Sequence, residues 1–144
     1  MIFTEENKRL GFIVCGYEFP KRTALKTEYD SDANWLNCEF RFYENGHEEI
    51  CVAPCLLTGE LSDFIMGLSY VIDGLKTSYS SDFLEPYLGI DIERVENRIK
   101  IRIEFEYDSR EDGKSWEVTS LIEIEQAKKF LNELKESQQL YPAR

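Results

Sequence analysis

Core-type residues recur at every second position between Trp35 and Tyr43, and this pattern requires a β-strand with one buried face. The apolar set is Leu36, Cys38, Phe40 and Phe42, and the intervening set is Trp35, Asn37, Glu39, Arg41 and Tyr43. A period of two separates the sets onto opposite sides of a strand, whereas a helix would mix them. Asn45-Gly46 follows and tolerates positive φ, which predicts a type I′ hairpin and a returning strand from His47 to Ala53.

Two other stretches have the spacing of amphipathic helices. Thr58 is expected to cap the first, whose stripe is Leu61, Phe64, Ile65, Leu68, Val71, Ile72 and Leu75. Gly67 and Gly74 weaken this helix slightly. The second runs from about Glu125 to Gln138, with Ala127, Phe130, Leu131 and Leu134 at helical spacing. Such narrow stripes suit helices that cover one face of a sheet.

The remaining segments complete the expected fold. An early strand is expected within Gly11–Phe19, an irregular strand and loop within 21–34, and further strands at Leu88–Val95, Arg98–Tyr107 and Trp116–Ile124. A polar loop holding Asp112-Gly113 precedes the last strand. Because hairpin connections dominate, the sequence predicts one α+β domain spanning 1–144, with an antiparallel sheet of about five to seven strands and two helices on one face.

The chain is strongly acidic, with 28 Asp and Glu against 17 Lys and Arg and a net charge of −11. Such a field repels phosphate backbones and anionic membranes and attracts basic partners. We therefore expect neither nucleic-acid nor membrane binding. Acidity is also common in soluble proteins that have no specific partner, so charge alone leaves function open.

The compartment follows from the first residues and from hydropathy. Glu5, Glu6, Lys8 and Arg9 stand where a signal peptide needs an apolar segment. No apolar run approaches the roughly 20 residues of a membrane-spanning helix. We expect a cytoplasmic protein whose four cysteines are free thiols.

Motifs for catalysis or cofactor binding are weak. His47, the one histidine, stands beside a tight turn, where an exposed residue is expected. Cys51 and Cys55, with Cys15, Cys38 and His47, lack the tight spacing of a zinc site. We expect no catalytic residue, metal or cofactor. The alternative is a small hydrolase or ligand-binding enzyme that uses carboxylates or a cysteine in a cleft between sheet and helices.

Acidic residues gather in two stretches, Glu28 to Glu49 and Asp82 to Glu93, which could converge on one negative patch with aromatic anchors. Alternatively, these carboxylates only keep the sheet edges soluble. The predicted partner-binding residues are Asp30, Asp32, Trp35, Glu39, Tyr43, Glu44, Glu48, Glu49, Asp82, Glu85, Tyr87, Asp91 and Glu93.

Three short segments resemble the bacterial WapI-type immunity proteins, which inhibit contact-dependent toxins. They are Asn34-Trp35-Leu36, Pro54-Cys55-Leu56-Leu57-Thr58 followed by Glu60-Leu61, and Phe83-Leu84-Glu85-Pro86-Tyr87-Leu88. Their order and spacing cover most of the chain from about Asn34 onward. The matched residues have structural roles, so the resemblance concerns the fold before the partner.

The resemblance implies a binding protein and supplies no catalytic residues, because such inhibitors occupy a toxin's active site or block its substrate surface. The implied partner is a cognate basic toxin domain, in particular one that degrades RNA. Its positive surface suits an acidic inhibitor. The oligomeric state stays open, and a homodimer through the open sheet face is an alternative.

Overall fold

The computed structural model describes residues 1–23, 29–107 and 114–144, which form eight strands, two α-helices and one 3-10 helix. In chain order these are β1 (Ile2–Glu5), β2 (Lys8–Tyr17), the 3-10 helix (Ser31–Asn34), β3 (Trp35–Glu44), β4 (His47–Leu57), α1 (Thr58–Ile72), β5 (Ser78–Ser80), β6 (Leu88–Val95), β7 (Arg98–Tyr107), β8 (Lys114–Glu123) and α2 (Ile124–Leu140). Glu28 and the Asp112-Gly113 loop lie outside the described residues. The predicted helices and longer strands are confirmed, whereas the short strands β1 and β5 had no counterpart in the prediction.

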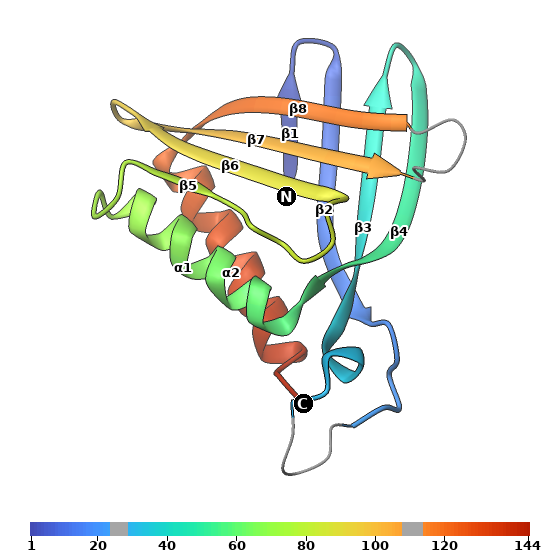
Figure 1. Cartoon of the computed structure of the whole chain (residues 1–144). Coiled ribbons are helices and arrows are strands. Elements are labelled where there is room, and N and C mark those ends of the chain that lie inside the picture. The colour runs from blue at the N-terminus through green and yellow to red at the C-terminus, as the bar shows by residue number, and fades with distance from the viewer. Residues whose placement is uncertain (24–28, 108–113) are drawn as a thin grey trace.

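The strands form two antiparallel sheets, sheet A with the order β1-β2-β3-β4 and sheet B with the order β5-β6-β7-β8. The α+β class is confirmed, but the prediction of one sheet of about five to seven strands with both helices on one face is wrong. Alternation along a strand shows only that one face is buried, not whether a helix or another sheet covers it. Here the apolar faces of the sheets pack on each other, and their strands cross steeply (Figure 1).

Aromatic side chains from both sheets fill the space between them. The rings of Phe40 in β3 and Phe105 in β7 stack with their centroids 3.9 Å apart. Phe42 stacks on Trp116 of β8 with a centroid distance of 5.2 Å. Such pairs add ring–ring attraction to the burial of a large apolar area, so they stabilise the crossed arrangement of the sheets.

The two helices cover the part of the core that the sheets leave open (Figure 1). The stripe predicted for α1 is buried as far as Ile72, but Leu75 lies beyond the end of the helix and is 72% exposed. From α2, Phe130 packs against Phe3 and Phe64, with ring centroids 5.0 and 5.8 Å away. No helix among the described residues combines the length and apolar character needed to cross a membrane.

Strand β1 joins the two sheets along one edge. The backbone amide of Thr119 in β8 donates to the Glu5 carboxylate at 3.0 Å, and the Ser120 hydroxyl donates to the Thr4 carbonyl at 2.6 Å. Sequence patterning does not detect this contact, because β1 has only four residues and its partner lies more than a hundred positions away.

Hydrogen bonds also tie together three distant segments through Asn34, Thr58, Glu60 and Leu84, which we call the junction. Helix α1 begins at Thr58 with Leu57 as its N-cap, so the prediction that Thr58 caps the helix is wrong. The Thr58 hydroxyl instead donates to Asn34 Oδ1 at 2.9 Å. The Glu60 carboxylate accepts from the backbone amides of Leu57 at 2.8 Å and Leu84 at 2.5 Å. Glu60, at the third helical position, thus satisfies the amide of the N-cap residue, which is one half of a capping box.

Candidate partner-binding surface

The outer face of sheet A is the side turned away from sheet B, which lies in front of it in Figure 1. The strand registers place three rows on this face: Thr4, Arg9, Tyr43 and Glu48; Ile2, Gly11, Arg41 and Ile50; and Ile13, Glu39 and Val52. Trp35 lies further along β3 on the same side and is half-buried. Four predicted partner-binding residues, Trp35, Glu39, Tyr43 and Glu48, therefore share this face.

Four aliphatic side chains are exposed on the outer face of sheet A. They are Ile2, Ile13, Ile50 and Val52, with 65%, 51%, 55% and 53% of their surface exposed. The sequence prediction missed them, because apolar strand residues are expected to point inward and only the register with neighbouring strands identifies the exceptions. Clustered apolar residues on an open sheet face are typical of a protein contact surface.

The cations of this face are paired within the face. Arg41 Nε lies 2.5 Å from Glu39 Oε1, and this contact raises the pKa of the Arg41 guanidinium. The Arg9 guanidinium lies 4.2 Å from the ring centroid of Tyr43, a cation–π contact. The middle of the outer face of sheet A is therefore close to neutral, although the whole chain is acidic.

A shallow concavity of about 530 Å³ lies over Gly11 on this face. Its lining includes Ile2 and Ile13 on one side and Arg41 and Tyr43 on the other. Gly11 has no side chain, so it forms the floor of the concavity and the side chains of its neighbours form the walls.

The β1–β2 and β3–β4 hairpin ends lie side by side at one end of sheet A (Figure 1). The Asn7 side-chain amide donates to Asn45 Oδ1 at 2.5 Å. Asn45 and Gly46 have φ angles of 52° and 84°, so the predicted type I′ turn is confirmed. These ends carry four carboxylates that we call the acidic rim: Glu6, Glu44, Glu48 and Glu49.

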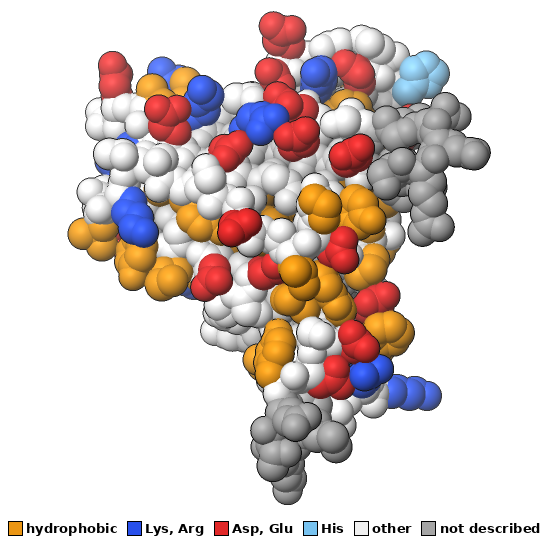
Figure 2. Space-filling view, in the orientation of Figure 1, with side chains coloured by type: hydrophobic (Ala, Val, Ile, Leu, Met, Phe, Trp, Pro, Cys, Tyr) orange, Lys and Arg blue, Asp and Glu red, His pale blue; other side chains and the backbone are white. Residues whose placement is uncertain are grey.

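Ion pairs dominate the outer face of sheet B, where Figure 2 shows acidic and basic side chains interspersed. Arg102 in β7 bonds to three carboxylates at 2.7–3.0 Å: Asp91, Glu104 and Glu117. The bond from Arg102 lowers the pKa of the Glu117 carboxyl. Glu93 lies 3.8 Å from Lys100. Asp91 and Glu93 thus have basic neighbours in the sheet, as in a solvated charged face.

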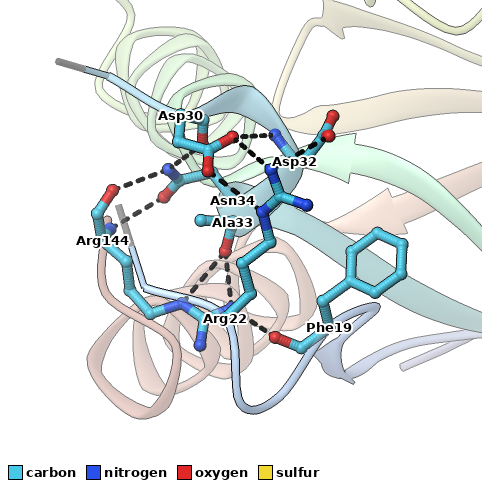
Figure 3. Close-up of polar contacts among 7 residues, drawn as sticks. All are labelled: Phe19, Arg22, Asp30, Asp32, Ala33, Asn34 and Arg144. Atoms are coloured by element: carbon cyan, nitrogen blue, oxygen red, sulfur yellow. Dashed lines mark hydrogen bonds and ion pairs between the residues drawn. The ribbon is translucent and has the colours of Figure 1, made fainter. Parts of the chain in front are cut away.

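Asp30 and Asp32 lie at the start of the 3-10 helix, beside Arg22 and Arg144 (Figure 3). This helix is near the C-terminus and far from the hairpin ends (Figure 1). The Asp30 carboxylate accepts from Arg22 Nε at 3.0 Å and from the Asp32 amide at 3.1 Å, and the bond with Arg22 lowers its pKa. Arg144 beside them donates to the carbonyl of Ala33 at 2.6 Å. These contacts give both aspartates a local role in holding this end of the fold.

The remaining predicted residues, Asp82, Glu85 and Tyr87, lie in the segment between β5 and β6. Asp82 is exposed and Glu85 is partly buried. Tyr87 packs against the buried cluster, and its carbonyl accepts the amide of Glu106 at 2.8 Å. Leu84 in the same segment is 67% exposed.

The two acidic stretches do not converge on one patch, so that part of the sequence prediction is wrong. Period-two alternation sends Glu39 and Glu48 to the outer face of sheet A, and Asp91 and Glu93 to the outer face of sheet B. Because the inner faces of the sheets meet, these two sets point to opposite sides.

The groups considered for catalysis or zinc binding do not form a site with His47: Cys38 and Cys55 are neighbours in the buried core. His47 is exposed at its hairpin turn, as predicted. Burial raises the pKa of the Cys38 and Cys51 thiols, away from the thiolate that a nucleophile or metal ligand needs. Across 1–23, 29–107 and 114–144, no three or more His, Cys, Asp or Glu side chains are placed to hold a metal ion.

A second concavity, of about 370 Å³, lies between β2 and α2, where the enzyme alternative would place its cleft. Apolar side chains line it together with Glu133 and Glu136. The Glu133 carboxylate is bound to the amino group of Met1 at 2.7 Å. The cysteines of the enzyme alternative are not part of this lining.

Comparison with known proteins identifies the family. No curated protein and no solved structure matches the chain. A family model described as the WapI-like immunity protein family matches residues 1–142. The match extends the resemblance seen from Asn34 onward to β1 and β2, which include part of the outer face of sheet A. The chain therefore belongs to the WapI-like immunity protein family.

Proposed function

We propose that the protein binds and neutralises a cognate toxin domain, and that this toxin is a basic nuclease acting on RNA. The family match over residues 1–142 carries the proposal, because an immunity protein has a toxin as its counterpart. We further propose that binding takes place in the cytoplasm, where the RNA of the producing cell has to be protected.

The charge distribution supports a basic target. A nuclease has to attract phosphate groups, so its substrate surface is positive. The net charge of −11 supplies long-range attraction for such a surface. The outer face of sheet B adds an acidic excess, with Asp91, Glu93, Glu104, Glu106, Glu117 and Glu123 against Arg98, Lys100 and Arg102. Complementary charge accelerates association and suppresses wrong partners.

Inhibition by occupation needs no reacting group, which fits the raised thiol pKa values and the exposed histidine. An inhibitor of this kind has to cover the toxin's active site or substrate surface. A standard protein interface buries about 800 Å² on each partner, so such contact has to involve a broad surface of the inhibitor.

Co-expression with the toxin domain encoded beside this chain tests the proposal. We expect the chain to restore growth and to form a complex measurable by calorimetry, with an association rate that falls as salt rises from about 0.05 to 0.5 M. Continued killing together with no complex would show that the toxin-binding function is wrong. A complex whose association rate does not depend on salt concentration would contradict the proposal that the toxin is basic.

A further inference from the structure

We propose that the outer face of sheet A is the surface that contacts the toxin, and that the concavity over Gly11 receives one apolar or aromatic side chain from it. This inference rests on the proposed function, and it names both the contact surface and the chemistry of the partner. Interfaces depend on a few desolvated anchors rather than on total area. The four exposed aliphatic side chains concentrate such anchors on this face.

The fold itself does not require glycine at position 11. A Cβ built on Gly11 would lie 3.5 Å from Arg41 Cβ, an ordinary van der Waals contact, and its φ is not in the left-handed region. Glycine in a strand interior lowers strand stability, and it often marks a place where another group approaches closely. The missing side chain leaves the hollow between Ile2 and Ile13 open to such a group.

The chemistry of the lining selects an apolar anchor over a basic one. Arg41 is held by Glu39 and Arg9 lies on the ring of Tyr43, so both cations stay beside the concavity. The lining holds two arginines and two carboxylates, Glu39 and Glu48, so no net charge there favours a lysine or arginine head. An aliphatic or aromatic side chain would instead contact the two isoleucines, the tyrosine ring and the methylene stems of the arginines.

The acidic rim determines what surrounds the anchor on the partner. Its carboxylates stand at the hairpin ends, at one end of sheet A: Glu48 lies beside Tyr43 on the outer face itself, whereas Glu44 and Glu49 alternate to the other side of the sheet. A matching surface therefore carries Lys or Arg on one side of its apolar anchor, as a nuclease surface does. A second copy of this chain is disfavoured, because both copies would bring a net charge of −11 and the same rim.

Matched valine substitutions at two outward-facing strand glycines test the proposal. Gly11→Val fills the concavity, and Gly89→Val adds the same side chain to the outer face of sheet B, where a Cβ would lie 3.9 Å from Glu104 Cβ. Valine favours strands, so both variants should unfold at the wild-type temperature or above it. We expect Gly11→Val to weaken binding of the neighbouring-gene toxin domain about tenfold or more, and Gly89→Val to leave it unchanged.

The outcomes separate this inference from the proposed function. Wild-type protein that neither binds nor protects contradicts the function itself. Wild-type binding that Gly11→Val leaves intact, or that Gly89→Val weakens instead, overturns the assignment to sheet A while the function stands. Should Gly11→Val fold poorly, Ile13→Ser replaces it, since Ile13 is half exposed on the same face. A toxin-free dimer seen by light scattering and disrupted by Gly11→Val would assign the face to a second copy and overturn the proposal.

Discussion

The junction and the outer face of sheet A differ in the contacts that their side chains make. At the junction, Asn34 is fully buried and its side chain uses two donors and two acceptors, on Asp30, Thr58 and Arg144. That is the full capacity of a carboxamide. On the outer face, aliphatic side chains are left in water and the few charges are paired locally.

This difference runs parallel to the position of the segments that carry the resemblance. The segments that resemble the family contain the junction residues Asn34, Thr58, Glu60 and Leu84. Of the four exposed aliphatic residues, none belongs to those segments. Those segments therefore describe a way of closing the fold, whereas the family match as a whole spans the outer face of sheet A as well.

The largest effect is expected from Asn34→Ala. It removes four hydrogen bonds and leaves the Thr58 hydroxyl and the backbone groups of Asp30 and Arg144 without this partner in a buried site. The free energy of unfolding should fall by about 3 kcal/mol or more, as measured by urea denaturation. Asn37→Ala, three positions later on the outer face, is the control and should cost less than about 1 kcal/mol. Equal losses of unfolding free energy in the two variants would mean that Asn34 matters no more to stability than Asn37.

The sequence predicted the local part of this architecture and missed its long-range part. Alternation gave the buried face of β3 correctly, because the side-chain period in a strand is fixed by the backbone. The second sheet was missed because the ring stacking of Phe40 on Phe105 joins residues 65 positions apart. Thr58 was assigned to a cap because local chemistry favours it, and only the fold brings Asn34 within hydrogen-bonding distance.

The candidate surface was predicted in part for the same reason. Charge and aromatic content identified Trp35, Glu39, Tyr43 and Glu48, which the structure places on one face. Acidity gave no information about the side of the molecule, so residues from the opposite sheet were grouped with them. The exposed aliphatic residues were missed because hydropathy alone assigns such residues to the core.

The next largest effect on stability is expected at a contact between α1 and β5. A Cβ on Gly67 would lie 2.1 Å from Tyr79 Cδ2, so this glycine permits the ring to pack on the helix. Alanine normally stabilises a helix interior by about 1 kcal/mol over glycine. Here we expect Gly67→Ala to destabilise by about 1–3 kcal/mol through overpacking.

Two measurements check the Gly67 prediction. Gly59→Ala in the same helix meets no atom within 4 Å and should be neutral or slightly stabilising in thermal unfolding. Burial raises the pKa of Tyr79 to about 12, so spectrophotometric titration reports whether its ring stays in place. In Gly67→Ala that pKa should fall toward its ordinary value. Stabilisation by Gly67→Ala with an unchanged titration would mean that the contact does not restrain the helix.

The smallest effect on stability is expected on the outer face of sheet A, from Val52→Thr. Val52 is 53% exposed, threonine has nearly the same shape, and both residues favour strands. The free energy of unfolding should change by less than about 0.5 kcal/mol. Val14→Thr makes the same substitution on the inner face, where Val14 is 5% exposed, and should cost about 1–3 kcal/mol because it buries a hydroxyl. A large loss for Val52→Thr would mean that its methyl groups support the sheet. A small loss of unfolding free energy together with faster dissociation of the toxin would mean that the aliphatic side chains of this face contribute to binding and not to stability.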